Sequence, residues 1–346
     1  MALSEVTPVD IYVFAFPRWK WRVLAQCFPN CRLRIVSRGA AIPSGACLVL
    51  WGQKPIPDGA PSDVRIFRLE DGFLRSVGLG ADLVRPMSWV VDRRGIYYDP
   101  RSPSDLEVIL SETEFTETLL ERARLLRERV VASGLTKYNV GSARWTRPAG
   151  QHQVILVAGQ VETDASIAVG APCLRTNLDL LKAVRQEHRD AYIVYKPHPD
   201  VLARLRKKGL HEDEAKAWCN ELVTDVDMSE MLAAVDEVHV LTSLAGFEAL
   251  LRGKKVTCYG QPFYSGWGLT CDKFPLLRRT RRLHLDQLVA GALILYPLYL
   301  SRDGKRQISV EEALDDLTAW RRGTGNRAPW WRGIYRVYLR LIFGVR

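Results

Sequence analysis

Four groups of polar side chains follow directly after apolar stretches that resemble β-strands. The first contains two adjacent carboxylates, Glu70 and Asp71, and then Arg75. In a doubly wound sheet, ligands bind outside the carboxyl ends of the strands. A carboxylate there can act as a general acid or base, and Arg75 can bind an acidic substrate. The structural alternative is an acidic turn in which Asp71 caps a helix.

The second group follows a continuous apolar run that ends at Ala158, and it contains Gln160 and Asp164. The Asp164 carboxylate could simply cap a helix. It could also act as a nucleophile that attacks an anomeric carbon. The residues alone leave both roles open.

The third group places His198 between Pro197 and Pro199, directly after Lys196. The two prolines restrict the backbone and therefore the directions in which the imidazole can point. An imidazole at a strand end can contact a leaving phosphate, and the lysine adds a positive charge. The pattern favours a functional histidine over a structural one.

The fourth group lies between a strand and a helix, where it offers hydroxyl and backbone donors to an anion. An ordinary helix cap is the alternative. The candidate donor-binding residues here are Ser243, Leu244, Gly246 and Glu248. In the Gly- and aromatic-rich loop 259–270, Gln261, Tyr264 and Trp267 could stack on a base or sugar and close over it.

The candidate metal ligands do not match a known metal-binding pattern. Asp225 and Asp227 form a DxD pattern, but no nucleotide-binding loop adjoins them. The cysteines are odd in number, contain no CxxC pair and lack a histidine cluster, so reduced thiols are the better interpretation. They are Cys27, Cys31, Cys47, Cys173, Cys219, Cys258 and Cys271. The sequence therefore predicts no metal and no bound cofactor.

The elements that must position these residues alternate between short apolar strands and amphipathic helices. In the first half, strands are predicted at 9–14, 33–35, 46–50, 65–69, 89–92 and 96–98, and a long helix at 103–134. In the second half, strands are predicted at 154–158, 192–195, 237–241 and 255–259, with helices at 177–187 and 245–251. This alternation predicts an α/β protein with two doubly wound parallel sheets that face a ligand-binding cleft.

The segment 137–153 contains glycine and proline and resembles a linker. We therefore predict a Rossmann-like domain at 1–145 and a second one at 150–325. Residues 327–346 combine apolar residues at helical spacing with arginines on another face and contain no acid. This pattern predicts a basic amphipathic helix on an anionic membrane surface, and the alternative is a final helix packed across the domains.

The bulk composition agrees with a two-domain globular protein. The chain has 346 residues, 47% of them hydrophobic, and a formal net charge of +10. The charge favours an anionic partner, and the sequence contains no RRM, KH, zinc-finger or basic-leucine-zipper pattern that would indicate nucleic acid. The first ten residues carry no basic run, and the apolar run 289–300 is too short to span a bilayer. A cytoplasmic location is therefore expected.

Together these segments resemble the β-Kdo transferase modules of the KpsC type, which help to build the Kdo linker of group 2-like bacterial capsules. The similar runs are EDGFLRSVGLGADLVRPMSWVVDRRGIYYDP from Glu70, GQVETDASI from Gly159, YKPHPDV from Tyr195, TSLAGFEALLRGKKVTCYGQPFYSGWGLTCD from Thr242, and YPLYL with ISVEEALDDLTAWR ending at Arg321. The family typically carries two such modules in one protein. The run GQVETDASI is more similar to the second module.

The resemblance implies a GT-B-like fold, CMP-Kdo as the donor, retention of configuration and no metal. It implies that Asp164 is the nucleophile, that His198 contacts the donor phosphate and that Ser243 helps to hold CMP. Glu70 and Asp71 are implied active-site acids, and we hypothesise that Glu70 takes the proton of the acceptor.

The implied partners are CMP-Kdo, a lipid-linked Kdo acceptor, the anionic inner face of the cytoplasmic membrane and other capsule biosynthesis or export proteins. Two alternatives are kept. One is another CMP-sugar transferase, such as a sialyltransferase-like enzyme. The other is a non-catalytic glycolipid-binding capsule protein.

Overall fold

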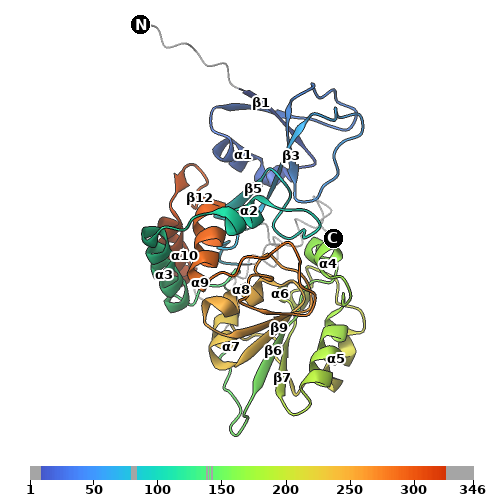
Figure 1. Ribbon diagram of the computed structural model, residues 1–346, viewed down its shortest axis with the longest axis vertical. Coiled ribbons are helices and arrows are strands. Elements are labelled where there is room, and N and C mark those ends of the chain that lie inside the picture. The colour runs from blue at the N-terminus through green and yellow to red at the C-terminus, as the bar shows by residue number, and fades with distance from the viewer. Residues whose placement is uncertain (1–8, 79–83, 138, 140, 142, 325–346) are drawn as a thin grey trace.

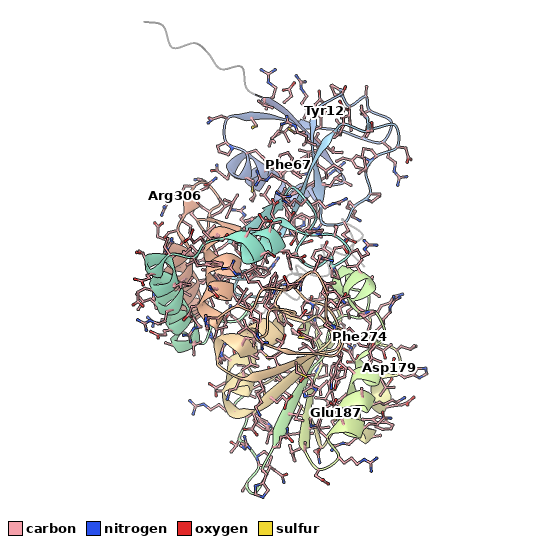
Figure 2. All side chains as sticks on the ribbon, in the orientation of Figure 1. Tyr12, Phe67, Asp179, Glu187, Phe274 and Arg306 are labelled. Carbon is pink, nitrogen blue, oxygen red and sulfur yellow. The ribbon has the colours of Figure 1, made fainter. Side chains whose placement is uncertain are left out.

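The computed structural model describes residues 9–78, 84–137, 139, 141 and 143–324. These residues form an α/β fold with two sheets (Figure 1). The first sheet has the strand order β13-β12-β5-β4-β3-β1-β2 and the second has the order β11-β10-β9-β6-β7-β8. In Figure 2, Tyr12 and Phe67 mark the first sheet, and Asp179 and Glu187 mark a helix beside the second.

The strands of the first sheet are β1 (Val9–Phe14), β2 (Cys31–Ile35), β3 (Cys47–Trp51), β4 (Arg65–Asp71), β5 (Ser88–Asp92), β12 (Pro297–Leu300) and β13 (Gln307–Ile308). Those of the second are β6 (Val154–Ala158), β7 (Tyr192–Lys196), β8 (Glu221–Leu222), β9 (Glu237–Val240), β10 (Lys255–Cys258) and β11 (Cys271–Asp272). The α-helices are α1 (Trp21–Cys27), α2 (Asp105–Glu112), α3 (Glu117–Ala132), α4 (Ala165–Gly170), α5 (Asn177–Glu187), α6 (Pro199–Leu202), α7 (Met228–Ala234), α8 (Leu244–Leu251), α9 (Leu285–Val289) and α10 (Val310–Thr324). Shorter helical turns are η1 (Arg18–Lys20), η3 (Glu212–Ala217) and the π-helical η4 (Ala290–Leu295).

The second sheet is wholly parallel and is covered on both faces. Every residue of β6 is buried. Val154 and Leu156 join the core cluster that contains α7 and α8, whereas Ile155 and Val157 join the one that contains α5. Figure 1 shows α5 and α7 on opposite sides of this sheet. This explains why β6 is a continuous apolar run, as the sequence predicts for a buried parallel strand: helices cover both faces of the sheet, so both faces of the strand need apolar side chains.

The first sheet departs from the prediction of a doubly wound parallel sheet. β1 to β4 are parallel, but β5 runs antiparallel to β4, and β12 runs antiparallel to β5. The described residues of the connection between β4 and β5, 72–78 and 84–87, contain no helix, and the strand after them runs back beside β4 in the antiparallel direction. The prediction is thus correct for α/β class and parallel strands, and wrong for the β5 side of this sheet.

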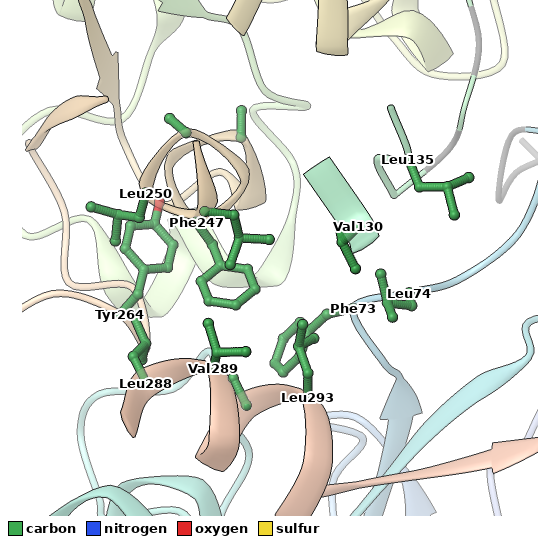
Figure 3. Close-up of a cluster of buried hydrophobic side chains, with 14 of the residues drawn as sticks. Phe73, Leu74, Val130, Leu135, Phe247, Leu250, Tyr264, Leu288, Val289 and Leu293 are labelled. Atoms are coloured by element: carbon green, nitrogen blue, oxygen red, sulfur yellow. The ribbon is translucent and has the colours of Figure 1, made fainter. Parts of the chain in front are cut away.

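After the second sheet the chain returns to the first. β12 and β13 extend the first sheet beyond β5, although the sequence assigns them to the continuous unit 150–325. One apolar cluster runs through both parts: Phe73 of the first stacks on Phe263 of the second, with ring centroids 4.5 Å apart. Figure 3 shows Phe73 and Leu74 in this cluster together with Phe247 and Leu293. The segment 297–308 therefore belongs structurally with the N-terminal strands.

Two predicted elements differ in detail. The helix predicted at 103–134 is broken into α2 and α3, because Thr113 is extended and Thr116 caps α3 by accepting the backbone N–H of Leu119 at 3.3 Å. Residues 96–98 form a turn and not a strand, with Asp99 N donating to Ile96 O at 2.9 Å. The predicted amphipathic tail, 327–346, lies outside the described residues.

The apolar run 289–300 is divided among the end of α9, η4 and β12. Among the described helices, none combines the length and the apolar character that crossing a membrane requires.

Candidate active site

The predicted site residues of the second sheet come from three neighbouring strands. β9, β6 and β7 are adjacent and parallel, so the loops after them meet at one edge of the sheet. These loops contain Asp164, His198 and Ser243, each of which caps the helix that follows. The helix-cap interpretation is therefore correct for Asp164 and Ser243, His198 is a helix cap that the sequence did not predict, and capping fixes all three side chains at the strand ends.

Asp164 is exposed at the start of α4. Its Oδ1 accepts both the backbone N–H of Ser166, at 2.9 Å, and the Ser166 hydroxyl, at 2.7 Å. Within the described residues no hydrogen bond ends on Oδ2. Capping thus holds the carboxylate in one orientation and leaves one oxygen for a ligand.

A buried amide links this cap to the loop after β9. Gln160 Nε2 donates to Ser166 Oγ at 2.8 Å and to Thr242 Oγ1 at 3.0 Å. Asn177 in turn fixes the backbone of Gln160, because its Oδ1 accepts the N–H of Gln160 at 2.9 Å and its Nδ2 donates to the carbonyl at the same distance. Gln160 therefore positions the loop around Asp164.

His198 caps α6 through its ring. Nδ1 accepts the backbone N–H of Asp200 at 3.1 Å, and Pro199 occupies the first helical position. Burial and, to a smaller extent, the charge of Lys137 lower the His198 pKa to about 4. The ring is therefore neutral at pH 7, and because Nδ1 accepts a hydrogen bond, its proton is on Nε2. Nε2–H can then donate to an anion.

Two lysines bring positive charge to this region. Lys196 ends β7 and is buried, which lowers its pKa, although Asp227 and Asp225 act in the opposite direction. Lys137 follows α3, and its charge acts on both His198 and Glu70. Lys137 was missed in the sequence because it lies in the predicted linker.

The candidates around α8 mostly serve the structure. Ser243 accepts the backbone N–H of Ala245 at 3.3 Å, and its carbonyl accepts the Tyr264 hydroxyl. A Cβ at Gly246 would lie 2.3 Å from the Tyr264 oxygen, so the glycine is needed for close packing. Glu248 is buried, which raises its pKa to about 7, and it accepts the backbone N–H of Lys137 at 2.6 Å. Leu244, half-buried, packs against the main core cluster. Gly246 and Glu248 are therefore packing and linker-anchoring residues.

On the first sheet, Glu70 and Asp71 end β4 in very different environments. The Asp71 carboxylate forms ion pairs with Lys20 Nζ at 2.5 Å and with Arg75 Nε at 2.7 Å. Burial alone would raise the Asp71 pKa, but the two cations lower it well below its usual range. For Glu70, burial and the neighbouring Asp71 charge raise the pKa to about 7. Asp71 is thus a fixed anion, and Glu70 can exchange a proton near neutral pH.

Arg75 does not have the role that the sequence predicts. The residue is 2% exposed, and besides Asp71 it donates to Ser76 Oγ at 2.7 Å and to the carbonyl of Val84 at 3.0 Å. All three guanidinium nitrogens are therefore engaged inside the protein, so Arg75 holds the turn after β4 and is not available to a donor.

Tyr98 connects the two parts of the site. A Cβ built on Gly52 would lie 2.6 Å from the Tyr98 hydroxyl and 3.0 Å from Glu70 Oε2, so these two groups adjoin. The Tyr98 carbonyl lies beside Gly170 at the end of α4, 3.5 Å from a Cβ built there. Burial raises the Tyr98 pKa, and the charges of Glu70 and Asp164 raise it further. The carboxylates of both sheets therefore act on one side chain.

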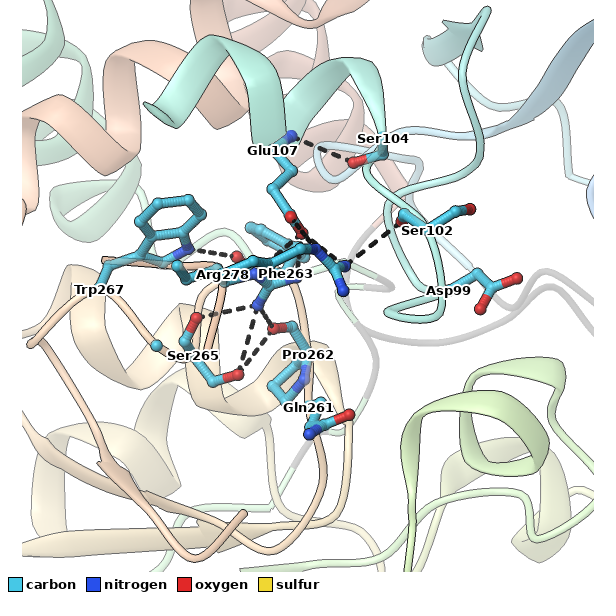
Figure 4. Close-up of polar contacts among 12 residues, drawn as sticks. Asp99, Ser102, Ser104, Glu107, Gln261, Pro262, Phe263, Ser265, Trp267 and Arg278 are labelled. Carbon is cyan, nitrogen blue, oxygen red and sulfur yellow. Dashed lines mark hydrogen bonds and ion pairs between the residues drawn. The ribbon is translucent and has the colours of Figure 1, made fainter. Parts of the chain in front are cut away.

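The aromatic loop is part of the core and not a movable wall. Tyr264 and Trp267 have no exposed surface, and Trp267 Nε1 donates to the carbonyl of Phe263 at 2.8 Å. Figure 4 shows Glu107 of α2 beside Arg278, and this carboxylate also pairs with Arg279 at 3.0 Å. The prediction that Tyr264 and Trp267 stack on a ligand is wrong, because both rings face the interior.

Of the three loop residues predicted to contact a ligand, Gln261 is the half-buried one. Its backbone N donates to the carbonyl of Gly170 at 2.7 Å, and its Nε2 donates to the carbonyl of Phe274 at 3.1 Å. Gln261 thus attaches the loop to the end of α4.

Three of the described residues form a group whose side chains could bind a metal ion. Candidate ligand atoms of His188, Glu237 and His239 lie within 4.8 Å of one another. His239 Nε2 lies 3.0 Å from Glu237, whose carboxylate also accepts the Thr257 hydroxyl at 2.9 Å. The group is at the amino end of β9, away from Asp164, and His239 Nδ1 also lies 3.3 Å from the Tyr259 hydroxyl. Of the DxD pair, Asp227 caps α7 and pairs with Arg321 at 2.9 Å.

The chain is similar to known proteins of bacterial capsule biosynthesis. The model of the family described as capsule polysaccharide biosynthesis protein matches residues 47–139 and 124–301. The chain belongs to this family. Among family relatives, the capsule polysaccharide modification protein LipA of Neisseria meningitidis serogroup A is 42% identical over 318 residues, which are 89% of this chain and 45% of LipA. The lipopolysaccharide-processing protein LpsZ of Rhizobium meliloti is 42% identical over 93% of this chain and 77% of its own length. The chain thus spans about half the length of LipA.

Two solved structures of KpsC from Thermosulfurimonas dismutans share the fold. The β-Kdo 2,7 transferase has a TM-score of 0.74 and 41% identity, over 90% of this chain and 99% of the other. The β-Kdo 2,4 transferase has a TM-score of 0.77 and 30% identity, over 91% and 99%. The resemblance to KpsC-type modules is confirmed.

Proposed function

We propose that this chain is a retaining β-Kdo glycosyltransferase that uses CMP-Kdo to extend a lipid-linked Kdo acceptor in capsule polysaccharide biosynthesis. Its likeness to two β-Kdo transferase structures supports the reaction class. The observation that carries the proposal is the position of Tyr98 between Glu70 and α4: the Tyr98 hydroxyl adjoins Glu70, the Tyr98 carbonyl lies beside Gly170 at the C-terminal end of α4, and Asp164 caps the start of this short helix. A nucleophile and a base on different sheets can then act on one sugar. The two sheets and their facing loops support a GT-B-like arrangement.

In the first step, Asp164 attacks the anomeric carbon of Kdo. The bond from that carbon to the CMP phosphate oxygen breaks, and CMP leaves with the electron pair. His198 donates Nε2–H to the departing phosphate, and Ser243 at the start of α8 holds the CMP group. Lys196 and Lys137 offset the repulsion between the carboxylate nucleophile and the two negative groups of the donor.

In the second step, a hydroxyl oxygen of the acceptor attacks the same carbon from the side that CMP left. The bond to Asp164 breaks, and the carboxylate returns to its starting state. Glu70 takes the hydroxyl proton, because its pKa of about 7 leaves it partly ionised at neutral pH. Two inversions give retention of configuration. We propose that lysine and histidine side chains supply the charge stabilisation without a metal or other cofactor.

The identity to the 2,7 transferase exceeds that to the 2,4 transferase, 41% against 30%. We therefore propose that the new linkage is to O7 of the acceptor. The sequence pattern of 327–346 supports association with the anionic inner face of the cytoplasmic membrane, where other capsule biosynthesis proteins would supply the lipid acceptor.

Intact-protein mass spectrometry tests the proposal. Wild-type protein and the Glu70→Gln and Asp164→Asn variants are incubated with CMP-Kdo, and in parallel with CMP-sialic acid. We expect Glu70→Gln to accumulate a covalent adduct of one Kdo residue, because the first step is intact and the second lacks its base. Asp164→Asn should show no adduct and should still bind CMP.

Three results contradict parts of this account. An adduct from CMP-sialic acid alone would favour a sialyltransferase-like enzyme. Failure of the wild type to release CMP from CMP-Kdo with any Kdo acceptor would favour a non-catalytic binding protein. Full turnover by Asp164→Asn would remove Asp164 from the nucleophile role.

A further inference from the structure

A polar cavity of about 230 Å³ opens on the first sheet at Arg68, two residues before Glu70 on β4. The side chains that give it its chemistry are Gln53, Arg68, Arg94, Asp99, Arg101 and Ser102, here named the arginine pocket. They come from the loop after β3, from β4 and from the loop that leads into α2. Figure 4 shows Asp99 and Ser102 on that last loop. None of these residues has a role in the two steps above.

The pocket contains three guanidinium groups and one carboxylate. Arg101 pairs with Asp99 at 2.8 Å, and Arg94 pairs with Asp105 at 3.3 Å. Arg68 forms no ion pair within the described residues. Its hydrogen bonds there both use Nη1, which donates to the carbonyls of Gly52 at 2.7 Å and Lys54 at 3.0 Å. The other two nitrogens of Arg68 remain for a ligand.

Arg68 is half-buried, and burial lowers its pKa. A partly desolvated cation without a carboxylate partner is unfavourable unless an anion binds to it. The guanidinium fork matches a carboxylate in a bidentate geometry. The pocket is therefore suited to a small planar anion.

The position of the pocket relative to Glu70 identifies the anion. Arg68 and Glu70 are two residues apart on β4, so both side chains point to the same face of the sheet. Gly52 lies between them. Its carbonyl accepts a hydrogen bond from Arg68 Nη1, and a Cβ built on Gly52 would lie 3.0 Å from Glu70 Oε2. The Cα atoms of Arg68 and Glu70 are thus about 7 Å apart along the strand, a spacing comparable to the length of one sugar ring with its substituents.

We infer that the arginine pocket binds the carboxylate of the acceptor sugar and so presents a hydroxyl of the same ring to Glu70. This inference rests on the proposed function, because it takes the acceptor to be a sugar acid. A lipid phosphate offers similar chemistry but would not lie on the same ring as the attacking hydroxyl.

The test compares two synthetic acceptors, an alkyl Kdo glycoside as the free acid and the same glycoside as its methyl ester. Neither contains phosphate. For the wild type we expect a lower KM with the acid. Arg68→Gln should raise the KM for the acid about 10- to 100-fold, leave the KM for the ester unchanged, and leave acceptor-free CMP release from CMP-Kdo unchanged. Arg65→Gln, an exposed residue on the same strand, is the matched control and should behave as the wild type.

Because Arg68 also holds two backbone carbonyls, Arg94→Gln provides a second variant with an exposed side chain. Its KM for the acid should rise in the same direction. Equal use of acid and ester by the wild type, or an equal effect of Arg68→Gln on both, would overturn the inference. If CMP-Kdo is not a donor at all, calorimetry can test acceptor binding to the arginine pocket separately from the reaction. The acid and the ester are each titrated into the wild type and into Arg68→Gln. Selective binding of the acid that is lost in Arg68→Gln supports the inference, and equal binding of acid and ester rejects it.

Discussion

At the residue scale, the adjacent carboxylates Glu70 and Asp71 show how environment separates two chemically similar groups. Lys20 and Arg75 hold Asp71 ionised, while burial and the Asp71 charge keep Glu70 protonated to a much higher pH. Lys20 itself lies 3.4 Å from the centroid of the Trp51 ring, which fixes its position by a cation–π contact. One carboxylate becomes part of the scaffold and the other becomes a candidate base.

The pH dependence of turnover should report Glu70. Below its pKa of about 7 the carboxyl carries the proton and cannot accept another, so kcat with a Kdo acceptor should rise as pH increases through that value. Glu70→Gln should lower kcat by about 10²- to 10⁴-fold and remove the rise. The measurement is kcat as a function of pH at saturating substrate.

Glu248→Gln is the matched control, because the pKa of Glu248 is also about 7 but its carboxylate binds the Lys137 backbone. This variant should retain the pH dependence. A rise with pH that survives in Glu70→Gln would assign the titration to another group.

The residues that the sequence reveals are those whose signal is local. Asp164, His198 and Ser243 each follow an apolar run, and each lies at the predicted strand end. Lys20 and Tyr98 gave no such signal, because their importance arises from contacts with Asp71 and with Gly52 and Gly170, far away in the chain. Such long-range contacts are not encoded in any short window of sequence.

At the element scale, α8 and the loop 259–270 form one packed unit and not a helix with a mobile cover. Gly246 allows the Tyr264 ring to approach α8, and the Tyr264 hydroxyl donates to the Ser243 carbonyl. The sequence predicts Gly246 as a ligand contact because it lies at a helix N-terminus after a strand, and Tyr264 because Gly- and aromatic-rich segments also characterise binding loops. Burial distinguishes the two cases, and sequence periodicity cannot reveal it in so short a segment.

Gly246→Ala should therefore destabilise the fold. The added Cβ would lie 2.3 Å from the Tyr264 oxygen and 2.8 Å from its Cζ, so the ring must move. We expect the free energy of unfolding to fall by about 1–3 kcal/mol, measured by denaturant unfolding.

Gly323→Ala, also in a helix, is the control, because a Cβ built at this position would meet no atom within 4 Å and no loss of stability is expected. Unchanged stability of Gly246→Ala together with weaker CMP binding would instead support the donor-contact role that the sequence suggested.

At the scale of the whole molecule, the sequence predicts the α/β class and most of the strands, and β1 has the predicted bounds. It does not predict the antiparallel pairing of β5 with β12, because these strands are some 200 residues apart and each resembles any short apolar strand. Pairing partners are set by the whole sheet and not by the strand itself.

The C-terminal segment 327–346 is the part of the chain that we propose to bind the membrane. Removal of residues 328–346 deletes the arginines at 332, 336 and 340 and the apolar residues between them. We expect the truncated protein to lose binding to liposomes that contain acidic lipid, while turnover of a soluble Kdo acceptor is unchanged. Co-sedimentation at low and high salt measures this.

The full chain should bind less at high salt, because the attraction is electrostatic. Equal sedimentation of the two proteins would place the membrane contact elsewhere or exclude it.

The return of β12 to the first sheet means that the second sheet and its helices form an insertion between two parts of one N-terminal unit. An inserted unit is covalently attached at both of its ends. Among homologues of this family, the unit that contains the second sheet could therefore be exchanged as an internal cassette with two junctions, whereas a simple fusion at one junction would leave β5 with an unpaired edge.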